Sequence, residues 1–390
     1  MRKISADYIF PISSPPIKNG IVVMDDSGII QEVLPAVSDR KPDAEIYEGV
    51  IVPGFVNTHC HLELSHLKGQ ISQRKGLAGF ISELLPKRNT FSPEQIKPAV
   101  ESAEGEMIRN GIVAVGDISN TDHSLEQKKK NRLAYHTFIE VFDLTPEKAD
   151  EKIAEAKSLL TKLKDPHVSI TPHSPYSVSG KLMELIDNLK QPFISIHNQE
   201  SELENEMFSA GSGQLADFMR KADVDIDSKH RFGNSLLFTL GALIETKKIL
   251  LVHNTYTSKA DIEIIKSYSH DGELEVVLCL CPKANLFIEN KLPDISMFLK
   301  EGMKLTVGTD SLASNDSLSV LEEMKAIAKH FPQIPFETLL EWSTKNGADF
   351  LGMEKEIGTI EKGKKPGLNL LKGINEKFEL SEKVSVQKLD

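Results

Sequence analysis

Eight short apolar segments, separated by longer amphipathic stretches, run through the middle of the chain. The short segments are rich in Val, Ile and Phe, which are typical of buried strands, whereas stretches such as residues 146–163 carry apolar residues at three- and four-residue spacing. The eight segments are residues 51–59, 111–119, 132–142, 167–173, 192–198, 248–254, 275–281 and 304–310. This alternation predicts eight strands with helices between them.

Strands that alternate with helices eight times are typical of a parallel sheet that closes on itself. Closure leaves no exposed strand edge, so we expect an α/β fold with a (β/α)8 TIM barrel rather than an open doubly wound sheet. Two connections are unusually long, residues 60–111 after the first strand and residues 198–248 after the fifth. Such insertions are expected to form a lid over the strand ends.

Both ends of the chain have a different sequence pattern from the middle, with short strands and turns but no helical period. Residues 20–34, GIVVMDDSGIIQEVL, place two β-branched runs around an Asp-Asp-Ser-Gly turn, which predicts a β-hairpin. Residues 357–373 repeat the pattern of short strands and glycine turns. We therefore expect residues 1–52 and 356–390 to form one small β-sandwich domain, and residues 53–355 to form the barrel.

Composition narrows the class of protein. Hydrophobic residues make up 40% of the 390 residues, which is ordinary for a globular protein. The net charge of −11, from 46 basic and 57 acidic residues, offers no basic face to nucleic acid. Neither a signal-peptide pattern nor an apolar run of about 18 residues is present, so we expect a cytoplasmic protein without a membrane partner and with its three cysteines reduced.

Histidines and one aspartate follow the predicted strands at their C-terminal ends. In a barrel of this kind these ends form one face, so residues far apart in sequence can converge there. The residues are His59 and His61 after the first strand, His173 after the fourth, His197 after the fifth, His253 after the sixth and Asp310 after the eighth.

The spacing of the first pair indicates a metal site. His59 and His61 are two residues apart on a strand, so both imidazoles point to one face and Cys60 to the other. Nitrogen ligands plus a carboxylate suit catalytic zinc or iron, which lowers the pKa of bound water to roughly 7. Asp310 supplies that carboxylate, or takes a proton from the water. Each residue alone could equally be a solvated polar group at a strand end, and their joint placement is what favours the metal.

Two further observations concern the chemistry. Glu200 lies three residues after His197 and could carry a proton from water to a leaving nitrogen, although a carboxylate at a helix N-terminus is the alternative interpretation. The fourth strand segment, residues 167–173, contains no lysine that could be carbamylated to bridge two ions. One divalent ion is therefore favoured over two, with zinc preferred and iron as the alternative.

Six motifs resemble the amidohydrolase superfamily, in particular its branch of adenosine, S-adenosylhomocysteine, guanine and triazine aminohydrolases. The motifs are PGFVNTHCH, TPHSPYSVS, HNQES, LVHN, CPKANLFI and GTDSLASND, and they extend over nearly the whole chain. The resemblance implies that His59, His61, His197 and Asp310 hold one metal ion. It also implies that His253 orients the attacking water, that Glu200 protonates a ring nitrogen and that His173 touches the substrate.

The implied function is hydrolytic deamination of an aminated purine, a nucleoside derivative or a similar N-heterocycle. Cleavage of a cyclic amide, a C–Cl bond or a guanidine is the alternative within the superfamily, and a catalytically inactive metal-binding barrel is the alternative from another class. The small heterocyclic substrate is the expected partner, and a homodimer is a further expectation.

The long connections should decide which substrate enters. Glu63, two residues past His61, resembles a feature of a subset that includes aminodeoxyfutalosine deaminases, and we expect it to contact substrate. Arg231 is expected to do so as well. It is one of five cations in these connections that could meet a substrate carboxylate, namely Lys68, Arg74, Lys75, Arg88 and Arg231.

Overall fold

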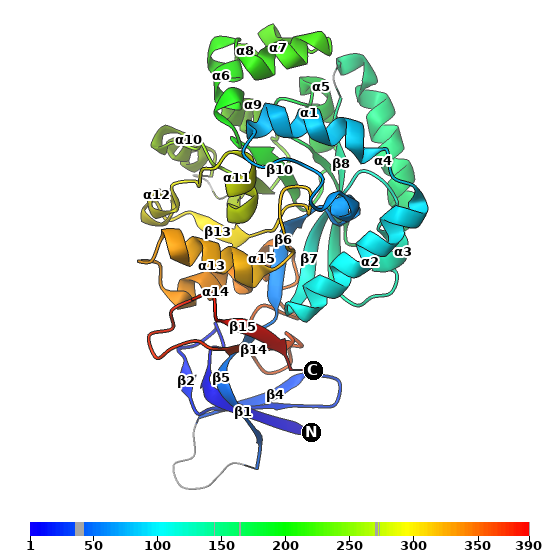
Figure 1. Cartoon of the computed structure of the whole chain (residues 1–390). Helices are drawn as coiled ribbons and strands as arrows, with labels where there is room; N and C mark the ends of the chain where they lie inside the picture. The colour runs from blue at the N-terminus through cyan, green and yellow to red at the C-terminus, as the bar shows by residue number, and fades with distance from the viewer. Residues whose placement is uncertain (36–42, 144, 164, 270–271, 273, 390) are drawn as a thin grey trace.

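The computed structural model describes residues 1–35, 43–143, 145–163, 165–269, 272 and 274–389. Residues 36–42 and 390, which belong to the predicted terminal domain, lie outside the described residues. Figure 1 shows a larger helical body with a smaller β-sheet at one end, and both chain termini lie in that sheet.

The larger body is built on parallel strands, which form two four-stranded sheets among the described residues. Every neighbouring pair within these sheets is parallel. One sheet contains β6 (Phe55–Cys60), β7 (Ile112–Ser119), β8 (Ala134–Val141) and β9 (Val168–Pro172); the other contains β10 (Ile194–Asn198), β11 (Lys248–His253), β12 (Glu275–Leu280) and β13 (Lys304–Val307). The predicted α/β class with parallel sheets is confirmed, and each predicted strand segment overlaps one of these strands.

Backbone contacts join the two sheets at both of their edges. Between β9 and β10, the amide of His197 donates to the carbonyl of His173 at 2.9 Å. After β13, the amide of Asp310 donates to the carbonyl of His59 at 3.1 Å, and Cys60 forms an isolated β-bridge with Asp310. These contacts bring the C-terminal ends of β6, β9, β10 and β13 close together.

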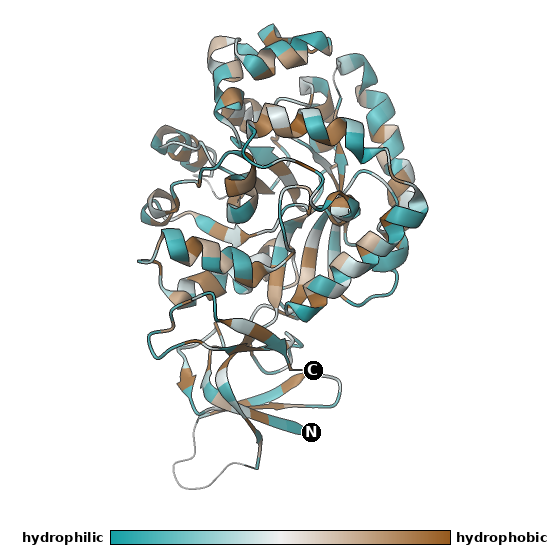
Figure 2. Ribbon diagram, viewed as in Figure 1, coloured by the Kyte–Doolittle hydropathy of each residue, from teal (hydrophilic) through white to brown (hydrophobic). Residues whose placement is uncertain are grey.

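Helices surround these strands, and Figure 2 shows their hydrophilic residues concentrated on the outer faces. In α4, for example, the buried residues Ala149, Ile153 and Ala156 follow the three- to four-residue period of a helix. The helices are α1 (Gly76–Arg88), α2 (Pro93–Arg109), α3 (Leu125–Lys128), α4 (Ala149–Leu163), α5 (Gly180–Asp187), α6 (Glu202–Ala210), α7 (Gln214–Lys221), α8 (Ile226–His230), α9 (Ser235–Ala242), α10 (Lys259–Ser269), α11 (Pro282–Ile288), α12 (Ile295–Lys300), α13 (Val320–His330), α14 (Phe336–Ser343) and α15 (Lys345–Phe350), with 3-10 turns η1 (Leu62–Leu67) and η2 (Pro146–Lys148).

Strands from both ends of the chain share one seven-stranded sheet. Its strands are β1 (Arg2–Ile9), β2 (Ile17–Lys18), β3 (Ile21–Met24), β4 (Ile30–Leu34), β5 (Glu45–Pro53), β14 (Leu368–Lys372) and β15 (Ser385–Lys388). The predicted hairpin is confirmed, because β3 and β4 pair antiparallel around a turn in which Asp25 Oδ1 accepts from the amides of Ser27 and Ile29.

The first predicted strand, residues 51–59, is two strands. β5 ends at Pro53 in the terminal sheet, and β6 begins at Phe55 in the parallel sheet. Gly54 lies between them, and its amide donates to the carbonyls of Pro366 and Gly367. A Cβ at this position would lie 2.3 Å from a methyl carbon of Val113, so only glycine allows the two sheets to approach this closely.

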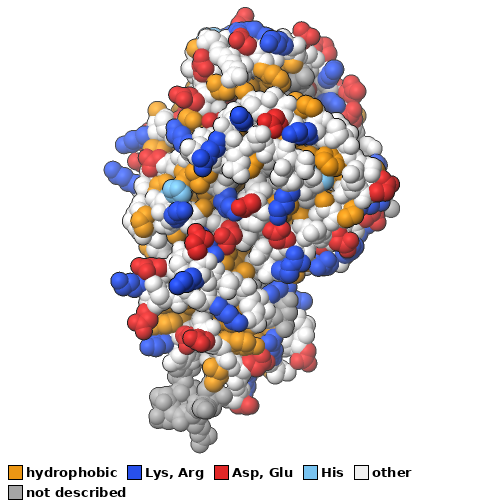
Figure 3. Space-filling model, viewed as in Figure 1, with side chains coloured by type: hydrophobic (Ala, Val, Ile, Leu, Met, Phe, Trp, Pro, Cys, Tyr) orange, Lys and Arg blue, Asp and Glu red, His pale blue; other side chains and the backbone are white. Residues whose placement is uncertain are grey.

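The two long connections are largely helical. Residues 60–111 hold η1, α1 and α2, and residues 198–248 hold α6 to α9, which lie at the end of the molecule remote from the chain termini (Figure 1). Acidic and basic side chains intermingle on the face shown in Figure 3. Over the described part of the chain, no helix combines the length and apolarity that a membrane span requires.

Candidate metal centre

His59 and His61 leave the end of β6 with their imidazoles facing each other. Their Nε2 atoms are 3.2 Å apart, and both side chains are buried. The chain immediately after His61 is fixed by Asp117 at the end of β7, whose Oδ1 accepts from the amide of Leu62 at 2.9 Å. The H-x-H pair is therefore presented by a strand end that is anchored to its neighbour.

Asp310 directs one carboxylate oxygen at this pair. Its Oδ1 lies 3.7 Å from Nε2 of His59 and 3.4 Å from Nε2 of His61, while its Oδ2 accepts a hydrogen bond from Ser314 Oγ. Burial by itself would raise the pKa of Asp310, but the contacts with His59 and His61 hold that pKa below its usual range. Asp310 is therefore a carboxylate with one oxygen available to an ion.

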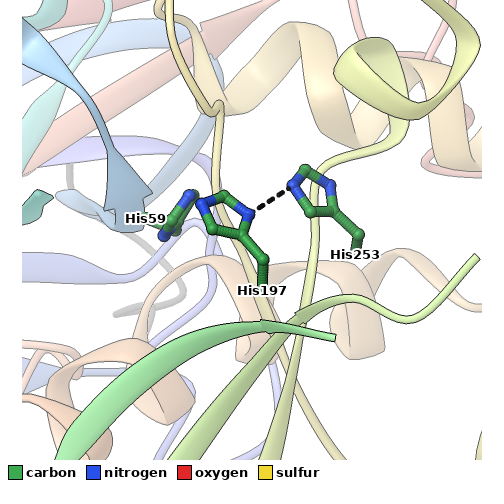
Figure 4. Close-up of side chains that lie close together, drawn as sticks. All are labelled: His59, His197 and His253. Carbon is green, nitrogen blue, oxygen red and sulfur yellow. Dashed lines mark hydrogen bonds between the residues drawn. The ribbon is translucent and has the colours of Figure 1, made fainter. Parts of the chain in front are cut away.

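His197 and His253 complete the cluster from the ends of β10 and β11. Figure 4 shows the two rings side by side with His59 next to them; Nε2 of His253 lies 3.0 Å from Nδ1 of His197, and the ring planes differ by 15°. On its other side, Nδ1 of His253 lies 3.2 Å from Oδ1 of Asn285 on α11. Because that amide oxygen can only accept, Nδ1 carries the proton and Nε2 is free to accept.

The chemistry of these donors fits a divalent ion. Potential ligand atoms of His59, His61 and Asp310 lie within 4.8 Å of one another, and so do those of His59, His197 and His253. Burial lowers the pKa of His59, His61 and His197, so these imidazoles are neutral and present lone pairs. Nδ1 of His59 is buried and has no hydrogen-bond partner among the described residues.

Glu200 lies beside this cluster, two residues beyond the end of β10. Its Oε1 is 3.6 Å from Nε2 of His253, and the residue is 5% exposed. Burial raises the pKa of Glu200 to about 7, although the proximity of His253 opposes the shift. A carboxyl group with this pKa can both donate and accept a proton near neutral pH.

His173 borders the cluster on the side of β9. Its ring centroid is 4.9 Å from that of His197, and its Nδ1 lies 2.7 Å from Ser177 Oγ and 2.9 Å from Ser174 Oγ. Burial lowers the pKa of His173 to about 4, so the imidazole is neutral at physiological pH. The outer ring edge of Phe142 lies nearby, with centroids 6.1 Å apart.

Several residues at these strand ends have left-handed backbone conformations. Gln199, His253, Asn254 and Asp310 have φ values of 44°, 74°, 55° and 56°. Such conformations are uncommon for residues other than glycine and cost on the order of 1 kcal/mol each, and they gather where function requires a particular side-chain direction.

The two residues expected to contact substrate lie in different surroundings. Glu63 is buried in η1, where its carboxylate accepts from Arg88 Nη2 at 2.7 Å and from Thr121 Oγ1 at 2.7 Å. Its hydrogen bonds are therefore made within the protein, and one of them comes from Arg88. Arg231 is exposed at the end of α8, and no described contact joins it to the histidine cluster.

Glu140 also lies at this centre, although the sequence pattern did not single it out. It lies at the end of β8, and its Oε1 is 3.7 Å from Nε2 of His197. Its ligand atom also lies within 4.8 Å of those of His61 and His197. Burial raises the pKa of Glu140 to about 7, opposed by the hydrogen bond from Asn120. Glu140 lacks the signal that identified the histidines, because the apolar segment continues beyond it through Val141 and Phe142.

A comparison with known protein families shows to which family the chain belongs. The profile of the amidohydrolase family matches residues 50–389. The chain belongs to the amidohydrolase family. The predicted family is thus confirmed, and so is the predicted enzyme class, a hydrolase of this family.

Curated members of the family and solved structures resemble this amidohydrolase over most of its length. The 5-methylthioadenosine/S-adenosylhomocysteine deaminase of Thermodesulfovibrio yellowstonii is 26% identical over 400 residues, covering 94% of this chain and 84% of the relative. The adenosine deaminase of Helicobacter pylori is 27% identical over 349 residues, covering 86% and 82%. The structure of Helicobacter pylori aminofutalosine deaminase with methylthio-coformycin aligns with a TM-score of 0.78 at 25% identity, covering 97% and 94%.

Proposed function

We propose that this protein is a metal-dependent hydrolytic deaminase of an aminated purine nucleoside or a similar N-heterocycle. The observation that carries the proposal is the convergence of His59, His61, His197 and Asp310 beside a protonatable Glu200. The relatives support it, because those described above are deaminases of adenosine, methylthioadenosine, S-adenosylhomocysteine or aminofutalosine by name.

His59, His61, His197 and Asp310 are the proposed holders of one divalent ion, zinc in preference to iron. Neutral imidazoles and one carboxylate are the usual protein ligands of catalytic zinc. When bound, the ion acts as a Lewis acid that makes water nucleophilic near neutral pH.

The residues around the proposed ion transfer protons and position the water and the substrate. The reaction adds water oxygen to the amidine carbon and breaks the bond from that carbon to the amino nitrogen, which leaves as ammonia. Glu200 in its acid form gives a proton to the adjacent ring nitrogen, and Asp310 accepts a proton from the water and passes it to the departing amino nitrogen. The remaining proton of the water oxygen returns to Glu200 as the product carbonyl forms. Nε2 of His253, whose Nδ1 is held by Asn285, accepts a hydrogen bond from that water and so orients it. His173 contacts the substrate from the side of β9.

Arg88 is the proposed substrate contact among the five cations of the long connections. Its side chain is 20% exposed, and one guanidinium nitrogen, Nη2, contacts both Glu63 and Asn120. Its charge helps to lower the pKa of His61 and of His173, which supports a position near the histidine cluster. Lys68, by contrast, is 48% exposed and pairs with Glu106. The remaining guanidinium N–H groups of Arg88 can donate to an oxygen of the substrate.

The architecture that presents this site is part of the proposal. The two parallel sheets are taken to form one closed (β/α)8 barrel within residues 53–355, supported by the hydrogen bonds that join β9 to β10 and β6 to the end of β13. Residues 1–52 and 356–390 are taken to form the β-sandwich domain. A cytoplasmic location and a homodimer complete the proposal, and light scattering of the purified protein tests the dimer.

Ammonia release tests the proposed reaction. The protein reconstituted with zinc is incubated with adenine, adenosine, methylthioadenosine and S-adenosylhomocysteine, and both ammonia and the hydroxylated product are quantified. The proposal expects equal amounts of ammonia and deaminated product from at least one compound. Metal-loaded, folded protein that releases ammonia from none of them, but opens a cyclic amide or expels chloride, would contradict it.

A further inference from the structure

The turn that presents Glu200 lies between β10 and α6 and is buried. Gln199, directly before Glu200, has a left-handed backbone conformation with a φ of 44°, which is uncommon for a residue other than glycine. Such a conformation persists only where the surrounding structure holds it. The residues that hold this turn therefore also set the position of Glu200.

The segment after β11 holds the acceptor atoms of Gln199. Its Oε1 accepts from Thr257 Oγ1 at 2.6 Å, and its carbonyl accepts from the amide of Tyr256 at 3.0 Å. The backbone amide of Gln199 is also buried, and a buried amide without a partner is costly. This amide needs a separate acceptor.

Glu204 supplies that acceptor from the first turn of α6. Its side chain is fully buried, and its Oε1 accepts from the amide of Gln199 at 3.0 Å. Burial raises the pKa of Glu204 to about 7, while hydrogen bonds from the amides of Gln199 and Glu200 oppose the shift. In a capping box the third residue of a helix accepts from the amide of the N-cap residue. Glu204 is the third residue of α6, but its carboxylate reaches past the N-cap Ser201 to the amides before it.

We infer that Glu204 is a positioning residue for Glu200. Its hydrogen bonds to the backbone of residues 199 and 200 fix the turn from which the Glu200 side chain extends to within 3.6 Å of His253 Nε2. Glu204 thus acts through the backbone and not by contact with the reacting atoms. This inference rests on the acid role of Glu200 in the proposed function.

Two substitutions of Glu204 separate the acceptor from the charge. Glu204→Gln keeps an oxygen that can accept from the same amides, whereas Glu204→Ala removes it. In the full-length zinc protein, kcat should fall about 10- to 100-fold in Glu204→Ala, because displacement of a reacting group by about 1 Å is this costly, and should stay near the wild-type value in Glu204→Gln. Zinc content and KM should be unchanged in both variants. Equal kcat of Glu204→Ala and wild type overturns the inference, and so does an equal loss in the two variants.

A double-mutant cycle shows whether Glu204 acts through Glu200. If Glu204 only positions the acid, Glu204→Ala has little further effect on kcat in a protein that already carries Glu200→Gln. The same fold loss in the Glu200→Gln background and in the wild type overturns the inference, because it shows an effect on the structure that is independent of Glu200.

Glu104→Ala is the matched control for general destabilisation. Glu104 on α2 is also fully buried, and it accepts from Tyr135 OH at 3.0 Å and from Gln127 Nε2 at 2.5 Å, which lie outside this turn. The midpoint of urea unfolding should fall in both alanine variants, whereas kcat should fall only in Glu204→Ala. An equal loss of kcat in Glu104→Ala overturns the inference.

Crystal structures of the wild type and Glu204→Ala give a readout that does not depend on turnover. The inference expects Gln199 to leave its left-handed conformation and Glu200 Oε1 to move farther than 3.6 Å from His253 Nε2. A turn that is unchanged in the variant overturns it. If Glu204→Ala does not fold, Glu204→Asp takes its place, because a side chain one methylene shorter withdraws the carboxylate from the amide of Gln199.

The two proposals fail in different ways. A zinc-loaded wild type that releases no ammonia contradicts the proposed function, and the crystal structures then still test the contact between Glu204 and the turn. A wild type that releases ammonia, with a Glu204→Ala variant of equal kcat, contradicts only the role of Glu204.

Discussion

Arg88, the last residue of α1, donates from Nη2 to Oε1 of Glu63 at 2.7 Å. Glu63 lies only two residues beyond His61, so this contact ties α1 to the strand end that presents the first two proposed ligands. Thr121 holds the other oxygen of Glu63 through both its amide and its hydroxyl. The guanidinium of Arg88 is therefore fixed before any substrate arrives.

Replacement of Arg88 by methionine should mainly weaken substrate binding. Loss of the remaining guanidinium donors removes contacts made equally in the ground and transition states, so KM for the preferred nucleoside should rise about tenfold or more with kcat little changed. Steady-state kinetics check this. The matched control is Lys87→Met on the same helix, since Lys87 pairs with Glu83 and Gln70 instead. Unchanged KM in Arg88→Met would remove Arg88 from the substrate site.

Glu200→Gln should keep its zinc and lose turnover. Glutamine preserves the shape of the side chain but cannot deliver a proton, and general acid–base groups typically contribute about 10²- to 10⁴-fold to rate. Metal analysis and kcat are measured together, with Glu202→Gln, an exposed residue in the first turn of α6, as the control. A fully active Glu200→Gln variant would show that another residue transfers the proton.

The rate should fall as the pH rises above neutrality. Burial raises the pKa of Glu200 to about 7, and the acid form is the one that gives up its proton. Well above this pKa the fraction of acid form decreases tenfold for each pH unit, so log(kcat/KM) should approach a slope of −1. Initial rates between pH 5.5 and pH 9 check this. A flat profile up to pH 9 would contradict an acid role for this carboxyl.

Lys229 should make stability depend on pH in the alkaline range. The side chain is buried, its Nζ donates to the carbonyls of Pro175 and Val178, and burial lowers its pKa to about 7 against the opposing charges of Asp143 and Asp225. Below pH 7 the amine is protonated in both the folded and the unfolded state. Between pH 7 and about 10.4 the folded state alone loses the proton, so its stability rises with pH.

The comparison with Lys229→Met isolates this effect. The free energy of unfolding of wild type relative to the variant should increase by up to about 1.4 kcal/mol per pH unit from pH 7 to pH 9. Urea unfolding at several pH values measures it. A difference between the two proteins that does not change with pH would mean that Lys229 stays charged in the folded protein.

The strands and the histidine cluster could be predicted because both leave local signals in the sequence. Apolar runs mark β6 to β13, and residues at strand ends such as His59 and Asp310 follow directly from them. The break at Gly54 could not be predicted, since it depends on the carbonyls of Pro366 and Gly367, more than 300 residues away in sequence.

Contacts between distant segments also decided the roles that the sequence left open. The sequence could not distinguish which of the five cations in the long connections contacts the substrate. The folded surroundings favour Arg88, which contacts Glu63 and Asn120. Glu140 could not be predicted because it lies inside an apolar strand segment, and its proximity to His197 depends on the folded arrangement of the strands.

The metal content of His61→Ala tests the central claim most directly. Apo protein is reconstituted with zinc, freed of excess metal and analysed by mass spectrometry alongside wild type and His123→Ala, a histidine outside the cluster. The account predicts one zinc per chain in wild type and in His123→Ala, and little or none in folded His61→Ala. Zinc content in His61→Ala equal to that of the wild type would contradict the assignment of the metal centre.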